Sequence, residues 1–142
     1  MLRNSRPQTG LEAKFSMQFA MAAALVVRKV GLAELTDDFV RRPQVQAIFP
    51  RVSVSTTGEI AGGGNFAPFD AVEITTTRGQ TLASGPVTHA KGSPQNPLSP
   101  TELFEKFSDC LDQAGYPDAK KSRTFERLMM FHKFDGTGDL TL

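Results

Sequence analysis

Two histidines and one cysteine are the side chains in this sequence best suited to proton transfer or nucleophilic attack. His89 and His132 lie far apart, and neither has a carboxylate at metal-ligand spacing beside it. The helical spacing of His132 from Leu128 and Met129 favours a histidine at the edge of a core over a catalytic base. Cys110 lacks a flanking cation or helix N-terminus that would favour the thiolate, so we expect a small buried hydrophobe.

Three further patterns imitate functional motifs. The glycines at 62–64 could present N–H groups to a phosphate, but no helix start or lysine follows at the required spacing, which indicates a loop. Asp37 and Asp38 are adjacent and cannot share a helix face, so they are typical of a helix start. Several cations at 120–133 are typical of a solvated helix face, with an anion-attracting surface as the alternative. These cations are Lys120, Lys121, Arg123, Arg127 and Lys133. The residues alone therefore show no complete active site.

The composition excludes several classes of protein. The chain has 142 residues, 39% apolar and 22% charged, with a formal charge of +1, which is typical of one globular domain. We expect no nucleic-acid or membrane partner, because either would require clustered cations. A single cysteine excludes a disulfide framework and a zinc site built on several thiolates. No apolar run approaches the ~20 residues that span a bilayer. Glu12 interrupts the basic region of a signal-peptide-like start, so we expect a cytoplasmic protein.

The elements that must position these residues begin with one long helix. Residues 1–11 predict an irregular lead-in, and the helical spacing of apolar residues predicts a helix from Glu12 to Lys29, ended by Gly31. Residues 19–27 are apolar on every side, whereas a surface helix shows a stripe. Something must therefore cover the opposite face of this helix.

The rest of the chain alternates between strands and helices. Short helices are expected after Thr36 and from Pro43, and strands at 51–57, 72–77 and 80–87. Loops are expected at 58–68 and 91–98. Helices follow from Ser99-Pro100 to Gly115 and at 118–134. This order predicts a single α+β domain over residues 1–142, with a small antiparallel sheet of about three strands packed against helices.

Two segments carry a family resemblance. Residues 12–20 read Glu-Ala-Lys-Phe-Ser-Met-Gln-Phe-Ala, and residues 92–99 read Gly-Ser-Pro-Gln-Asn-Pro-Leu-Ser. Both resemble the MmgE/PrpD family, which includes 2-methylcitrate dehydratase, cis-aconitate decarboxylase and iminodisuccinate epimerase. The resemblance covers nearly the whole chain and corresponds to the second, smaller α+β domain of those enzymes.

The resemblance implies a site in the cleft between two domains. A large helical domain would supply most proton-moving groups, and no metal or organic cofactor would be needed for the decarboxylase and epimerase chemistry. Lys14, Ser16, Gln18 and Phe19 would lie nearest the cleft. The decarboxylase has tyrosine at the position of Phe19, which cannot donate a proton, and arginine at that of Lys14. Both differences weigh against decarboxylation.

Three functions remain open from the sequence. The first is a domain of an MmgE/PrpD-like enzyme that acts on small di- or tricarboxylates as a dehydratase, decarboxylase or epimerase and is inactive alone. The second is a non-catalytic interaction module that binds a helical partner, or a second copy, through the apolar helix 15–29. The third is a folded relic without a role. The expected partner is the helical domain, in the same or a separate chain, or a homo-oligomer.

Overall fold

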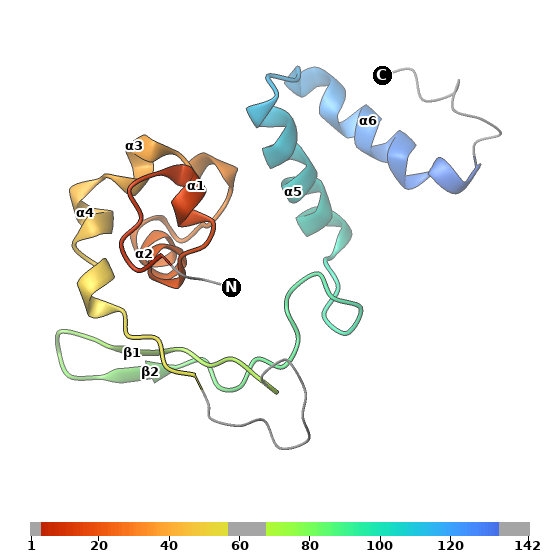
Figure 1. Ribbon diagram of the computed structural model, residues 1–142. Helices are drawn as coiled ribbons and strands as arrows, with labels where there is room; N and C mark the ends of the chain where they lie inside the picture. Colours follow the sequence, from red (N-terminus) through yellow and green to blue (C-terminus); the bar gives the residue numbers. More distant parts are fainter. Residues whose placement is uncertain (1–3, 57–67, 134–142) are drawn as a thin grey trace. The chain divides into compact units, whose positions relative to one another are not determined.

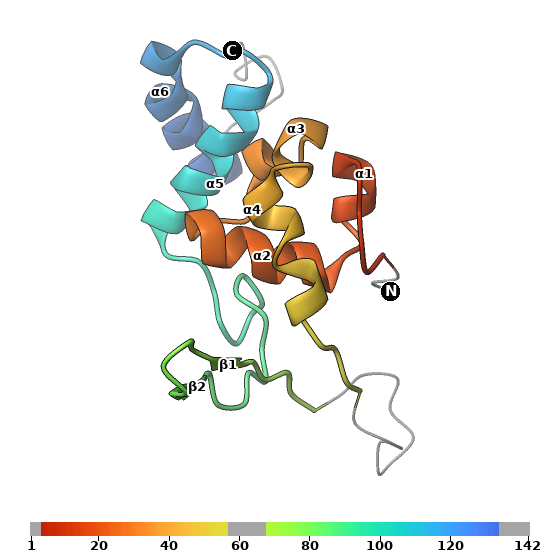
Figure 2. The same cartoon turned by 90° about the vertical axis from the view of Figure 1, so that its left-hand side faces the viewer.

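The computed structural model describes residues 4–56 and 68–133 of the chain. The chain divides into two units, one made of 1–54 with 102–142 and the other of 55–101. Each unit is described by itself. Figures 1 and 2 show two views of the elements of both.

The amino-terminal part of the first unit is a set of short helices (Figure 1). They are α1 (Gly10–Ala13), α2 (Met17–Val27), η1 (Leu32–Glu34), α3 (Asp37–Val40), α4 (Pro43–Gln46) and η2 (Phe49–Arg51). Their buried apolar side chains form one core, which comprises Ala13, Phe19, Ala22, Ala23, Phe39, Val40, Val45 and Phe49. The rings of Phe19 and Phe39 meet edge to face at its centre, with their centroids 6.1 Å apart.

The expectation of one helix from Glu12 to Lys29 is wrong, because the chain breaks at residues 14–16. Ser16 is extended (φ −130°), and its hydroxyl accepts a hydrogen bond from the N–H of Phe19 at 3.1 Å, which starts α2. The helix α1 has its own start, a capping box between Thr9 and Glu12. The end of α2 is also earlier than expected, because Arg28 adopts the left-handed conformation (φ 58°) ahead of Gly31.

The lead-in to α1 is irregular from Asn4 to Thr9, but hydrogen bonds hold it in place. The N–H of Asn4 donates to the carbonyl of Phe15 at 3.1 Å. The side chains of Gln46 and Arg41 donate to the carbonyls of Pro7 and Gln8 at 3.1 and 3.0 Å. These bonds satisfy backbone groups that regular structure leaves unpaired.

Two amphipathic helices form the rest of the first unit. The helix α5 (Pro100–Gln113) begins at the expected proline, and Gly115 in the left-handed region (φ 67°) follows its end. The helix α6 (Asp118–Met129) precedes η3 (Phe131–Lys133), so the helix expected at 118–134 ends earlier. The ring of Phe125 on α6 packs against Phe104 and Phe107 of α5, with centroid separations of 5.1 and 5.4 Å.

Lys121 joins the two helices and is not part of a solvated face. Its side chain is buried and forms ion pairs with Asp112 of α5 and Asp118 of α6. The ammonium donates hydrogen bonds to both carboxylates, and these raise the pKa of Lys121 above its ordinary value. The bond to Asp112 has the larger effect. The ion pairs therefore stabilise the fold at neutral pH, and the contribution linked to the raised pKa of Lys121 is lost as the pH rises through that pKa. Lys120 and Arg123 are exposed, as expected.

The second unit contains a two-stranded antiparallel sheet. Strand β1 (Glu73–Thr75) pairs with β2 (Thr81–Ala83), with Ile74 opposite Leu82. Gly79 (φ 79°) lies in the turn between them, as the Arg78-Gly79 pair predicts. All strand residues are exposed. The α+β class is thus confirmed, and the described residues form two strands in place of the expected three or so.

The missing strand is the one expected at 51–57. Arg51 ends the helical turn η2, and residues 52–56 adopt no regular structure. An alternating pattern has the period of a strand, but it becomes one only where a second strand supplies hydrogen bonds. The glycines at 62–64 and most of the loop expected at 58–68 lie outside the described residues.

We expect Gly10→Ala to destabilise the first unit. A Cβ atom there would lie 2.1 Å from the carbonyl oxygen of Leu35. Because that neighbour is backbone, the clash should lower the free energy of unfolding by about 1–3 kcal/mol in urea denaturation. The matched change Gly31→Ala should cost less, since the nearest atoms, at 2.9 and 3.0 Å, belong to the side chains of Lys29 and Asp109, which can move more readily than backbone. Equal losses in the two variants would contradict this explanation.

Candidate functional site

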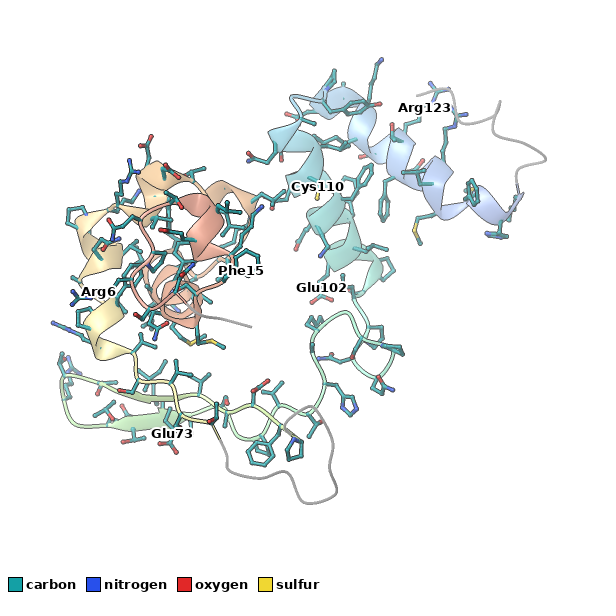
Figure 3. All side chains as sticks on the ribbon, in the orientation of Figure 1. Arg6, Phe15, Glu73, Glu102, Cys110 and Arg123 are labelled. Atoms are coloured by element: carbon teal, nitrogen blue, oxygen red, sulfur yellow. The ribbon has the colours of Figure 1, made fainter. Side chains whose placement is uncertain are left out.

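The break between α1 and α2 forms the first candidate site, which we call the α1–α2 junction (residues 14–18). Lys14 follows the last residue of α1, and its side chain is exposed. Phe15 is 49% exposed, and Leu11, on α1, is 69% exposed. Figure 3 labels Phe15 on this part of the ribbon. The junction therefore presents one exposed cation, Lys14, next in the sequence to the exposed ring of Phe15.

The structure assigns different positions to the four residues that the resemblance implies. Ser16 is buried and its hydroxyl caps α2. Phe19 is 1% exposed and belongs to the core. Lys14 is exposed and Gln18 is half-buried, so both have side-chain atoms at the surface. Their position in a cleft wall remains a prediction.

The charge of Lys14 is not neutralised by the neighbouring glutamate. The carboxylate of Glu12 accepts the N–H groups of Gln8 and Thr9 at 2.7 and 3.2 Å. Among the described residues, the recorded ion pairs involve Lys29, Arg41 and Lys121 and do not include Lys14. An exposed, unpaired ammonium can form charge-assisted hydrogen bonds with a carboxylate ligand.

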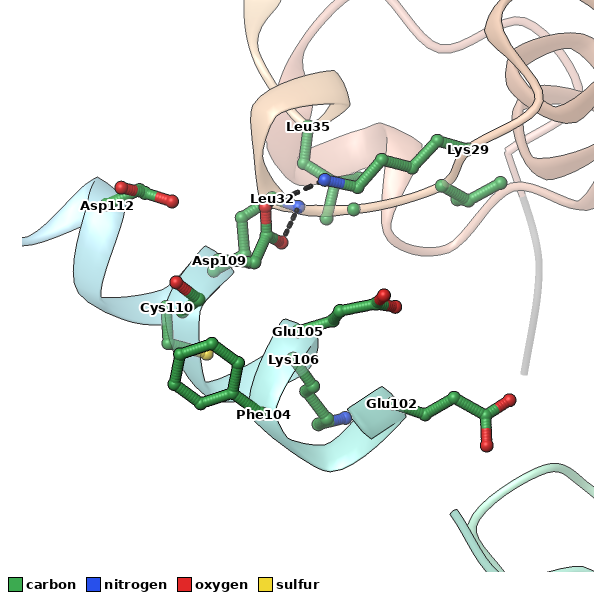
Figure 4. Close-up of a pocket in the computed structure, with 13 residues that line it drawn as sticks. Lys29, Leu32, Leu35, Glu102, Phe104, Glu105, Lys106, Asp109, Cys110 and Asp112 are labelled. Atoms are coloured by element: carbon green, nitrogen blue, oxygen red, sulfur yellow. Dashed lines mark hydrogen bonds and ion pairs between the residues drawn. The ribbon is translucent and has the colours of Figure 1, made fainter. Parts of the chain in front are cut away.

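A cleft of about 780 Å³ forms the second candidate site. It is lined by residues 29–32, Leu35 and one side of α5 (Figure 4). Asp109 of α5 is one of the lining residues and accepts hydrogen bonds from the N–H of Leu32 at 3.2 Å and from Nζ of Lys29 at 3.0 Å.

These contacts change two ionisation equilibria. Two hydrogen bonds lower the pKa of Asp109 below its ordinary value. The larger effect comes from the N–H of Leu32 and the smaller from the ammonium of Lys29. The same carboxylate raises the pKa of Lys29. Both shifts favour the charged forms at neutral pH, so the pair is ionised there.

The residues with the most reactive side chains do not assemble into a catalytic set. Cys110 is exposed beside the cleft, which corrects the expectation of a buried side chain. It follows Asp109 on α5 and is not among the rings of Phe104 and Phe107 that pack on Phe125. His132 is exposed in η3, so it is not at a core edge.

His89 is exposed in the second unit, where Nδ1 lies 2.9 Å from the hydroxyl of Thr88. Within residues 4–56 and 68–133, no group of three His, Cys, Asp or Glu residues could hold a metal ion. The same residues include no helix long and apolar enough to cross a membrane.

Sequence reasoning missed Asp109. Its partners Leu32 and Lys29 lie 77 and 80 residues away in the sequence. A local pattern cannot reveal such a contact, although the absence of a capping side chain at Gly31, just before η1, is a signal that another group must accept the N–H of Leu32.

The sequence model of the MmgE/PrpD C-terminal domain matches residues 1–129, a range that contains the α1–α2 junction and α5. The chain belongs to the MmgE/PrpD family. A comparison with curated protein sequences gives no match. The junction lies in the first of the two segments that resemble the family, so the MmgE/PrpD domain carries one exposed cation within that segment.

The burial of Phe19 predicts that this MmgE/PrpD domain does not accept a tyrosine there without loss. A hydroxyl added to its ring would enter the core beside Phe39, and we expect Phe19→Tyr to lower the free energy of unfolding by about 1–3 kcal/mol. The same substitution at the half-exposed Phe15 should change it by less than about 0.5 kcal/mol. Thermal or urea unfolding measures both, and a neutral Phe19→Tyr would show that the ring has access to solvent.

Proposed function

We propose that this MmgE/PrpD domain forms part of an enzyme that acts on small di- or tricarboxylates. The reaction would begin with removal of a proton next to a carboxylate and continue as dehydration, decarboxylation or epimerisation. The observation that carries the proposal is the family match over 1–129 together with the exposed ammonium of Lys14 in the matched range.

The proposed role of Lys14 is to bind a substrate carboxylate. Its charge is unpaired among the described residues, and Leu11 and Phe15 provide apolar surface near it in the sequence. A hydrogen bond between charged groups contributes about 1.5–3 kcal/mol. Gln18, half-buried at the start of α2, would add an amide that can donate to a second oxygen of the substrate.

The proton transfer requires groups that the described residues do not place beside Lys14. Ser16 holds the start of α2, and Phe19 has no ionisable atom. General acid–base catalysis depends on a positioned group within hydrogen-bond reach of the proton. We therefore propose that a helical MmgE/PrpD domain, in the same or another chain, supplies the second wall and the base, and that the 142-residue chain alone is inactive.

Turnover measurements test this proposal. The purified chain should show no turnover of 2-methylcitrate or cis-aconitate, because the proposed base belongs to the helical domain and is absent from this chain. Co-expression with a helical MmgE/PrpD domain should produce turnover of a carboxylate substrate. Turnover by the chain alone, or none in any combination, would contradict the proposal.

The role of Lys14 has its own variant. In the active combination, Lys14→Met should raise KM by roughly 10- to 100-fold, because it removes a charge-assisted hydrogen bond to the substrate. Lys120→Met removes an exposed cation from α6 and should leave KM unchanged. An equal effect of the two substitutions would exclude a specific role for Lys14.

A second candidate function rests on the exposed end of α2. Leu25, Val26 and Val27 are 49%, 36% and 38% exposed, while Ala22 and Ala23 of the same helix are completely buried. Adjacent apolar side chains at a surface are typical of a binding face. We propose as the alternative that this end of α2 binds a helical partner or a second copy of the chain without catalysis.

Light scattering tests the self-binding form of this alternative. It predicts a concentration-dependent dimer, which Val26→Glu should dissociate because the carboxylate would have to lose its water. Leu128→Glu places the same charge at an exposed apolar position on α6 and should leave the dimer intact. A monomer at all concentrations would argue against a second copy as the partner.

A further inference from the structure

The N-terminus of η1 receives its cap from a distant part of the chain. The residue before η1 is Gly31, which has no side chain to cap the helix. The N–H of Gly31 donates to Glu34 at 2.7 Å, and the N–H of Leu32 donates to Asp109 at 3.2 Å. Unpaired N–H groups at a helix start favour a carboxylate, so Asp109 replaces the missing local cap.

The same carboxylate also holds the segment that follows α2. Its other oxygen accepts a hydrogen bond from Nζ of Lys29 at 3.0 Å. Arg28, just before Lys29, is the one described non-glycine residue with a positive φ (58°). A left-handed conformation costs an L-residue roughly 1–2 kcal/mol, so the surrounding contacts must favour it. Asp109 provides such contacts, because it accepts hydrogen bonds from Lys29 before Gly31 and from Leu32 after it.

The contacts of Asp109 join two parts of the first unit, each of which has its own cluster of aromatic rings. The amino-terminal helices share the core around Phe19 and Phe39, whereas α5 and α6 share the ring cluster around Phe125. The cleft between residues 29–35 and α5 has a volume of about 780 Å³, so apolar packing across it is incomplete. The two hydrogen bonds of Asp109 are therefore polar contacts that hold these parts together where apolar packing is incomplete.

We propose that Asp109 is a latch that holds the α5–α6 hairpin against the segment between α2 and η1. With the latch closed, the cleft has the form seen in Figure 4. With the latch open, the hairpin moves away as a body, held together by Lys121 and Phe125, while the amino-terminal core stays folded. Val30 and Leu32 line the cleft and are already exposed, so opening would chiefly uncover the half-buried Leu35 beside them.

The test combines a local and a global measurement on the full chain. Asp109→Ala should accelerate amide hydrogen exchange at Leu32 by about tenfold or more, because a hydrogen bond to a charged group is lost. It should also broaden the distribution of distances between two spin labels, one on each side of the cleft. Suitable label positions are Gln44 and Arg123, which are exposed on α4 and α6, in a background with Cys110→Ser.

Glu105→Ala is the matched control. Glu105 lies on the same helix, lines the same cleft and carries the same charge, but it is not a partner in the recorded hydrogen bonds between described residues. It should leave both measurements unchanged. Lys29→Met keeps the cap of Leu32 and removes the ion pair, so it should broaden the distances less than Asp109→Ala does.

The possible outcomes separate a latch from a simple cap. Faster exchange at Leu32 together with broader distances supports the latch. Faster exchange with unchanged distances would show that Asp109 only caps η1, and unchanged exchange would show that the cap is not formed, so either result overturns the proposal. Unchanged chemical shifts at Phe19 and Ala22 confirm that the core stays folded in each variant.

Discussion

The hydrogen bond from the N–H of Phe19 to the hydroxyl of Ser16 is the interaction on which the candidate site depends. It starts α2 anew after α1, and the change of direction exposes Lys14 and Phe15. The same start sets the rotation of α2, so that Phe19 meets Phe39 in the core. A continuous helix would keep all these residues on one cylinder, and the cation would not lie in a break between two helices.

The two halves of α2 have different environments although their composition is similar. Alanines at positions 22 and 23 let the neighbouring helices come close, and they are fully buried. Leu25 to Val27 extend beyond the short helices that cover the first half, so their side chains remain accessible. Apolar residues on every side of a helix predict cover on every side. Within the described chain that cover is partial for the first half of α2, where Phe19, Ala22 and Ala23 are buried, and lacking for Leu25 to Val27.

Elements with local signals were predictable from the sequence. The proline that begins α5, the glycine after its end and the Arg-Gly turn of the hairpin all lie where they were expected. The break at Ser16 was not predictable, because Phe15, Phe19 and Ala22 keep a helical spacing across it and the spacing contains no information on the backbone of Ser16. The strand expected at 51–57 failed for a related reason, since alternation describes a side-chain pattern and not the presence of a pairing strand.

Asp109 shows the limit of local reasoning most clearly. An aspartate within an amphipathic helix has the pattern of a solvated residue, and its role arises only because the α2–η1 segment brings two donors to it. The glycine before η1 shows in the sequence that this helix start has no local side chain to accept the N–H of Leu32. The residue that accepts it, Asp109, lies 77 positions after Leu32. The MmgE/PrpD domain thus uses a local serine to start α2 and a remote aspartate to start η1. The serine is buried beside the core and its contact lies within one helix, whereas the aspartate is partly exposed and connects α5 to the segment between α2 and η1.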